Sequence, residues 1–217
     1  MSVRFIYYTT SQASVLLPII AGLFYYTKLN KPFKVLFWFF VLSVLFEVQA
    51  KICGILYNNN MPGLHLFTFI EMFAFSTVYY FHFSKSKFLT SLILLNAISF
   101  SLVAISDAVY FNGIFAPNNI SRTYSSISLT VFALIYFYHL FVKELQFYSW
   151  QYPMFWLSTG VLIYFGLNLL YFMLLNYLIS NATFTGQISS YTHAAINIIA
   201  NCLFAQSFRC HKNFIMK

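Results

Sequence analysis

The sequence predicts an all-α integral membrane protein, a polytopic bundle of seven transmembrane helices. Of its 217 residues, 60% are hydrophobic and only 7% are charged, whereas a soluble domain carries about a quarter charged residues. Seven apolar stretches come close to or exceed the length of about 20 residues that crosses a bilayer core about 30 Å thick. Lipid offers no hydrogen-bond partner to an open backbone, and no alternation typical of a β-barrel is visible, so we expect each stretch to be a helix.

The predicted spans follow one another with short connections, so we expect residues 1–217 to form one domain. Pro18 is expected to kink the first span because proline lacks the N–H that a helix needs. The polar run Asn58–Gly63 predicts a tight turn between the second and third spans. Asp107–Ile120 predicts a longer connection before the fifth span, whose ends Asp107 and Arg122 are expected to tie together. The predicted spans are residues 10–27, 35–57, 64–83, 88–106, 121–142, 154–179 and 189–208.

Basic residues are shared unequally between the two sides of the predicted bundle. Because lysine and arginine favour the cytoplasmic side of a membrane, we expect the N-terminus outside and the C-terminus in the cytoplasm. In this setting the formal net charge of +8 reflects topology, and nucleic acid is not an expected partner. The residues on the cytoplasmic side are Lys28, Lys31, Lys34, Lys85, Lys87, Lys143, Arg209, Lys212 and Lys217, against Arg4 and Arg122 on the other.

Three ionisable residues are expected deep in the bilayer, Glu47 and Lys51 in the second span and Glu71 in the third. At a rise of 1.5 Å per residue, they lie about 15, 9 and 10 Å from the outer boundary. Glu47 and Lys51 are four residues apart and therefore share a helix face. Lys51 and Glu71 share a depth, so we expect an ion pair between them. Charge at such depth is costly and faces the interior of a bundle or water.

Uncharged polar residues are expected at a depth similar to that of the three ionisable residues. His193, Asn197 and Asn201 are spaced by four along the last span and form one stripe. Two polar residues of the sixth span repeat this spacing, and a histidine lies at the outer start of the third span. Two interpretations remain open, an outward-facing ligand pocket and a set of contacts that only hold the helices together. The candidate pocket residues are Glu47, Lys51, His65, Glu71, Tyr164, Asn168, His193, Asn197 and Asn201.

The sequence carries no motif of a known catalytic or metal-binding type. Its three cysteines are not spaced as metal ligands, and the histidines lack the acidic neighbours of a hydrolytic zinc site. The last predicted span has no lysine that could bind retinal as a Schiff base. We therefore expect no catalytic residues, no metal and no cofactor, and an enzyme acting on lipid is the least favoured function.

Two segments, Leu64–Glu71 and Phe155–Phe165, occur together with Glu47 and with the polar stripe on the last span. In these features the chain resembles a family of small uncharacterised bacterial seven-helix membrane proteins. The resemblance covers most of the chain. It implies a place in the bacterial cytoplasmic (inner) membrane and a sensory or accessory role in envelope signalling, with no established activity.

These features together predict a receptor-like or accessory membrane protein that binds a small ligand or a lipid headgroup in the outward pocket. It would signal through a membrane or cytoplasmic protein partner, because its own cytoplasmic connections are too short for an output domain. One alternative is a proton-coupled transporter that uses Glu47 and Glu71 as relay groups. Another is a structural subunit of a membrane complex, in which the charges only lock helices together. A homo-oligomer is compatible with each.

Overall fold

The computed structural model describes residues 3–143, 149–173 and 184–214, and every regular element in these ranges is a helix. The predicted all-α class is therefore confirmed for the part of the chain that the structure describes. Short 3₁₀ or π-helical segments, labelled η, extend or interrupt several α-helices. In chain order the elements are α1 Val3–Ala13, α2 Leu16–Tyr25, η1 Tyr26–Lys28, α3 Lys31–Tyr57, α4 Met61–His82, α5 Lys87–Ser106, η2 Asp107–Phe111, α6 Asn119–Tyr138, η3 His139–Lys143, η4 Ser149–Gln151, α7 Pro153–Val161, η5 Leu162–Gly166, α8 Leu167–Met173 and α10 Phe184–Phe214.

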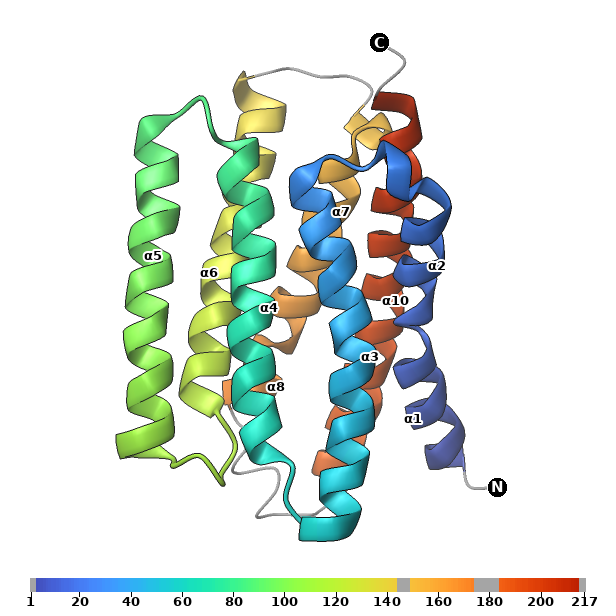
Figure 1. The fold of residues 1–217 in the computed structure, drawn as a ribbon, viewed down its shortest axis with the longest axis vertical. Helices are drawn as coiled ribbons and strands as arrows, with labels where there is room; N and C mark the ends of the chain where they lie inside the picture. Colours follow the sequence, from blue (N-terminus) through green and yellow to red (C-terminus); the bar gives the residue numbers. More distant parts are fainter. Residues whose placement is uncertain (1–2, 144–148, 174–183, 215–217) are drawn as a thin grey trace.

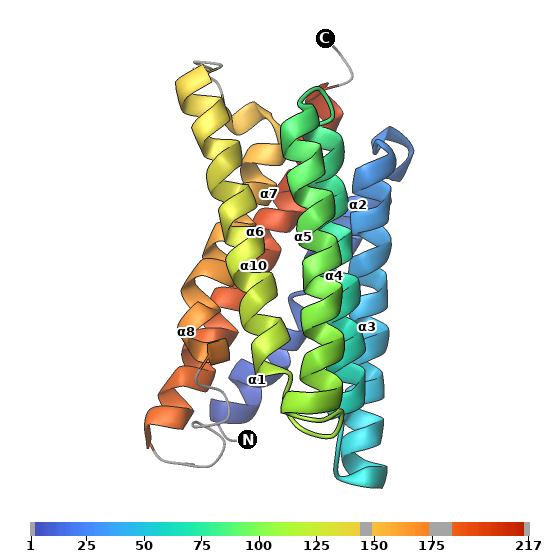
Figure 2. The ribbon, with the colours of Figure 1, turned by 90° about the vertical axis from the view of Figure 1, so that its left-hand side faces the viewer.

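In the described residues these elements form seven helical columns, and successive columns run in opposite directions (Figures 1 and 2). Two columns contain a pair of helices, α1 with α2 and α7 with α8. Contacts of α10 with both α7 and α2 close the bundle, whereas α5 lies at its edge between α4 and α6. The N-terminus and the α3–α4 and α5–α6 connections lie at one end, and the C-terminus and the α2–α3 and α4–α5 connections lie at the other (Figure 1).

Four helices of the described chain are long and apolar enough to cross a membrane, and they coincide with the second to fifth predicted spans. Large apolar side chains remain on the outer surface, with Phe24, Ile55 and Phe88 each at least 75% exposed. Extended apolar surface of this kind marks a membrane or a partner. The seventh predicted span lies within α10, and the predicted end of the sixth, residue 179, falls outside the described residues. The four helices are Lys31–Tyr57, Met61–His82, Lys87–Phe111 and Asn119–Val142.

The first predicted span is interrupted one turn before Pro18. A turn at Ser14 and Val15 separates α1 from α2. Proline has no N–H for the carbonyl four residues earlier, and its ring crowds that carbonyl, which here belongs to Ser14. The Ser14 carbonyl instead accepts from the N–H of Leu17 at 3.0 Å. The expected kink is present, and it makes α1 a segment separate from α2.

The start of α3 is fixed by a cap that also holds the last helix. Oδ1 of Asn30 accepts from the N–H of Phe33 at 3.1 Å, a contact that asparagine favours at the N-cap. The N–H of Asn30 donates to Nε2 of His211 at 3.2 Å, beyond the predicted span 189–208. Burial lowers the pKa of His211 to about 4. The ring is therefore neutral at pH 7, the form in which Nε2 can accept this hydrogen bond.

The connection between α5 and α6 is shorter than predicted. Helical structure continues through η2, and α6 begins at Asn119, so the predicted bounds 107–120 are wrong. Asp107 is fully buried, and its Oδ2 accepts from the N–H and the Oγ of Ser121, both at 2.8 Å. This carboxylate therefore stabilises the N-terminus of α6. The predicted tie between Asp107 and Arg122 is also wrong, because Asp107 binds Ser121 whereas the Arg122 side chain pairs with Glu71 of α4.

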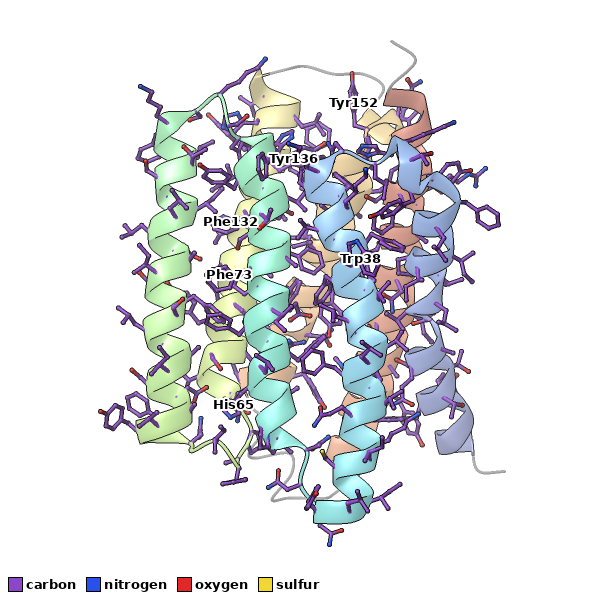
Figure 3. All side chains as sticks on the ribbon, viewed as in Figure 1. Trp38, His65, Phe73, Phe132, Tyr136 and Tyr152 are labelled. Atoms are coloured by element: carbon purple, nitrogen blue, oxygen red, sulfur yellow. The ribbon has the colours of Figure 1, made fainter. Side chains whose placement is uncertain are left out.

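Aromatic rings fill much of the space between the columns (Figure 3). Phe75 of α4 packs edge to face on Phe165 of η5, with ring centres 5.7 Å apart, and lies 5.5 Å from Phe204 of α10. Phe132 of α6, labelled in Figure 3, lies 5.8 Å from Tyr79 of α4. Such pairs contribute about 0.5–1.5 kcal/mol each beyond the burial of their area. These ring contacts connect α4 to η5, α10 and α6.

A glycine allows α2 to approach α3 closely. Gly22 is buried, and a Cβ at this position would lie 2.4 Å from Cδ2 of Phe37, a side chain that is itself buried. Small residues at helix contacts allow this approach in membrane proteins. Gly54 of α3 has the opposite surroundings, because a Cβ there would meet no atom within 4 Å.

Gly22→Ala is expected to destabilise the protein by about 1–3 kcal/mol, as overpacking of a close contact does. Gly54→Ala is the matched control and is expected to raise stability by up to about 1 kcal/mol, because alanine favours the helix. Thermal unfolding of both variants in dodecyl maltoside measures the difference. A Gly22→Ala protein as stable as the Gly54→Ala protein would contradict the close contact with Phe37.

Candidate functional site

A cavity of about 670 Å³ lies in the half of the bundle that carries the N-terminus. It reaches from Asn60 and Met61, at the α3–α4 connection, to Phe40 and Phe204 in the interior. Side chains of α1, α3, α4, α6, η5, α8 and α10 line it, and α5 contributes none. Small-molecule sites commonly have volumes of about 300–1,000 Å³. The cavity is therefore of a size that suits a small ligand.

Most of the residues predicted for a polar pocket line this cavity. His65 does not, because it lies at the end of α4 (Figure 3), where its Nε2 is 3.0 Å from the carbonyl oxygen of Ala116. Asn168 also lies behind the wall, and its Nδ2 donates to the carbonyl of Tyr164 at 2.8 Å. The predicted residues that do line the cavity are Glu47, Lys51, Glu71, Tyr164, His193, Asn197 and Asn201.

The buried ion pair beside the cavity joins Arg122 to Glu71. Nη1 of Arg122 donates to Oε2 of Glu71, and the two residues are only 6% and 3% exposed. In the part of the chain that the structure describes, this is the one salt bridge. The predicted pair of Lys51 with Glu71 is wrong. Lys51 is exposed near the rim of the cavity, whereas Arg122 belongs to the first turn of α6 and reaches Glu71 from inside the bundle.

Several groups hold the guanidinium of Arg122 in place. Its Nη2 donates to the hydroxyl of Tyr164 at 3.0 Å, and its Nη1 lies 3.4 Å from Oγ1 of Thr68. Its Cζ lies 5.8 Å from the centre of the Phe67 ring, a cation–π distance. Thr68 in turn accepts from Nδ2 of Asn118 at 2.7 Å. Arg122 thereby connects α6 with α4 and η5.

Glu47 lies on the α3 side of the cavity and is partly buried. Its Oε2 accepts from Nε2 of Gln12 in α1 at 2.7 Å. Lys51 is one turn further along the same helix face, as the spacing predicted, but no ion pair joins the two side chains in the described structure. Glu47 is therefore a carboxylate on the cavity wall whose direct contact is with an uncharged amide.

The polar stripe on α10 meets α1 and the turn that follows it. Nδ2 of Asn197 donates to Oγ of Ser11 at 3.0 Å, and Nδ2 of Asn201 donates to Oγ of Ser14 at 2.8 Å. Hydrogen bonds of this kind hold transmembrane helices together. The two asparagines therefore join the last column to the first while also lining the cavity.

His193 brings an imidazole to the part of the wall formed by α8 and α10. Its ring stacks on Tyr171, with ring centres 4.8 Å apart and planes 13° from parallel. Oδ1 of Asn168 lies 3.0 Å from Nδ1 of His193. Because the amide nitrogen of Asn168 is used by the carbonyl of Tyr164, its oxygen accepts here and Nδ1 of His193 carries a proton.

Gln12, Arg122 and Tyr171 line the cavity but were not predicted to do so. For Arg122 a signal exists, since Ser125 and Ser126 follow it at three and four residues. Their hydroxyls donate to the Arg122 carbonyl at 2.9 and 2.8 Å. A small, polar helix face in an apolar span indicates a face that packs on protein. Gln12 likewise stands in a small, polar run, Thr9–Ser14, whereas no comparable pattern surrounds Tyr171.

Within the described residues, no three His, Cys, Asp or Glu side chains are grouped so that they could hold a metal ion. Comparison of the chain with protein-family models, with curated proteins and with solved structures finds no match. Fold and site together define a helical protein with four helices that could span a membrane and a charged interior cavity.

Arg122→Leu is expected to destabilise the protein by about 3–5 kcal/mol, because it leaves the Glu71 carboxylate buried without its partner. The double variant Glu71→Leu/Arg122→Leu is expected to recover most of this loss, since neither charge then remains in the interior. Thermal unfolding of the single and double variants in detergent gives the coupling between the two sites. A double variant as unstable as the sum of both single variants would contradict the pairing.

Proposed function

We propose that the protein crosses the membrane seven times, with its N-terminus outside and its C-terminus in the cytoplasm. Four helices with the length and composition of membrane spans support this location. The end of the bundle that carries the C-terminus also holds Lys28, Lys31, Lys85 and Lys87, and basic residues favour the cytoplasmic side. The bacterial inner membrane is proposed from the family resemblance of segments such as Leu64–Glu71.

In that membrane, the protein binds a small ligand in the cavity, which then faces the outer side. The observation that carries this proposal is the cavity itself, a space of about 670 Å³ lined by aromatic rings and charged side chains. Mostly apolar pockets with a few placed polar groups are typical of small-molecule sites. A purely structural role accounts for the pair of Arg122 with Glu71 but gives no reason for Glu47 to line an open space.

The bound ligand acts through a partner protein in the membrane or the cytoplasm. The α2–α3 and α4–α5 connections, on the proposed cytoplasmic side, contain only Tyr26–Asn30, with the short η1, and Phe83–Ser86. Connections of this length hold no output domain. Another protein that contacts the bundle therefore responds to the bound ligand, and the chain itself is a receptor-like or accessory subunit.

Filling the cavity tests this function without removing any of its charged groups. Ala50 lies on the wall, so Ala50→Trp places an indole in the ligand space. Gly54 lies one turn further along α3 with open surroundings, so Gly54→Trp adds the same group outside the cavity. Native mass spectrometry of protein extracted gently from its own membrane should show a bound small molecule in the wild type and in Gly54→Trp. Occupancy in Ala50→Trp should be clearly lower, because a tenfold loss of affinity needs a steric cost of only about 1.4 kcal/mol.

Equal bound mass in the two tryptophan variants would show that the ligand lies outside this cavity. A stoichiometric protein partner with no small molecule in any of the samples would favour the structural subunit instead. Unfolding temperatures of the two variants, measured in the same detergent, exclude a loss of ligand through loss of the fold.

A proton-coupled transporter is the second candidate, and two interruptions of the helices favour it. The turn at Ser14 and Val15 and the π-helical segment η5 both meet the cavity, through Val15 and Tyr164. Interrupted helices beside a binding site are common in transporters, and π-helical turns are frequent at functional sites. In this mechanism Glu47 and Glu71 are the groups that exchange protons.

Transport is tested in proteoliposomes that contain a pH-sensitive dye. Under an imposed pH gradient, the wild type is expected to dissipate the gradient faster than liposomes without protein. Glu47→Gln is expected to bring the rate to the background, because an amide does not exchange a proton as a carboxylate does. Lys51→Gln keeps both carboxylates and is the control on the same helix face. Flat traces for the wild type at every pH would remove this candidate.

A further inference from the structure

Positive and negative side chains of the described chain line the cavity in equal number, but they lie at different depths. Among the described residues, the charged side chains that line the cavity are Glu47, Lys51, Glu71 and Arg122. Glu71 and Arg122 neutralise each other in their buried ion pair. Lys51 is exposed at the rim, whereas Glu47 is partly buried one turn further inside.

Depth decides which of the two remaining charges an occupant meets. Interactions between charges are several-fold stronger in a partly buried place than in water, because the effective dielectric constant is lower. The long side chain of Lys51 can extend to the outer membrane surface, where water and salt screen its ammonium, but they screen the Glu47 carboxylate less. The inner part of the cavity therefore favours a cation over an anion.

The surface around Glu47 is also suited to a cation. Phe46 is its neighbour in sequence, and the rings of Phe46 and Phe67 lie 5.6 Å apart. Both rings line the cavity together with Tyr8 and Tyr171. The faces of aromatic rings carry negative potential and attract ammonium groups. The ring of Phe67 already lies against one cation, the guanidinium of Arg122.

We propose that the ligand of this cavity is a small organic ammonium ion with an apolar body, and that Glu47 binds its charged group. The body lies against the aromatic rings. A carboxylate can accept several hydrogen bonds, so Glu47 can bind the ammonium while Gln12 keeps its contact at 2.7 Å. This inference rests on the proposed ligand-binding function and adds the chemical class of the ligand.

Three aromatic compounds of similar size and different charge test the proposal. They are benzyltrimethylammonium, uncharged N-benzylacetamide and anionic phenylacetate, titrated by calorimetry into the full chain in dodecyl maltoside, a detergent without ammonium groups. The cation should bind about tenfold more tightly than the uncharged compound, as a charge contact combined with cation–π contacts provides. Glu47→Gln, which keeps the shape of the side chain, should remove this preference. Lys51→Gln, the matched control on the same face, should keep or increase it.

The outcomes separate the ligand class from the function. Equal binding of the cation and the uncharged compound, or a cation preference that survives Glu47→Gln, overturns the ammonium proposal and leaves the cavity as a ligand site. A co-purified small molecule without a basic or quaternary nitrogen does the same. If none of the three compounds binds and no small molecule co-purifies, the proposed function fails as well. A co-purified phosphatidylethanolamine that benzyltrimethylammonium displaces would support the proposal and identify a lipid headgroup as the source of the ammonium.

Discussion

A buried ion pair between Arg122 and Glu71 constrains how the helices of the bundle are arranged. Each charge alone would be strongly unfavourable in the interior, so neither is tolerated there without the other. The pair fixes α6 against α4, and the hydroxyl of Tyr164 adds η5 to the same contact. Segments far apart in the sequence are thereby held at one level of the bundle. Because these side chains also line the cavity, the contact that orders the helices forms one wall of the candidate site.

The opposite side of the cavity is formed by α1, whose separation from α2 follows from Pro18. Because of this interruption, the first column is two short helices and not one straight helix. At the break, a side chain of α1 and one of the turn reach α10, through Ser11 to Asn197 and through Ser14 to Asn201. Hydrogen bonds of this type contribute about 0.6 kcal/mol on average between membrane helices. The α1 side of the cavity is therefore joined by weaker individual contacts than the side formed by the ion pair.

Local sequence signals were sufficient for the class of fold and for several helix limits, but not for the pairing of charges. Asn58, in the predicted turn, ends α3 in a left-handed conformation with φ of 51°. Such limits depend on nearby residues, so they can be recognised in the sequence. Depth along a helix is equally local, and it was the basis for expecting Lys51 to meet Glu71. Which side chains meet depends in addition on the rotation of each helix and on its neighbours. That information lies in tertiary packing, which brought Arg122 to Glu71 and left Lys51 exposed.

Glu47 connects the contents of the cavity with the position of α1. The same carboxylate accepts from Gln12 and, in the proposed binding of an ammonium ion, also holds the charged group of the ligand. Two groups bound to one carboxylate affect each other, and by thermodynamic linkage the effect is reciprocal. A ligand that strengthens or weakens the contact with Gln12 changes the preference of α1 for its place on the bundle by the same free energy. A receptor needs such coupling to report occupancy to a partner, and a transporter needs it to open one side of the cavity. Both candidate functions therefore require that Glu47 couple ligand binding to the position of α1.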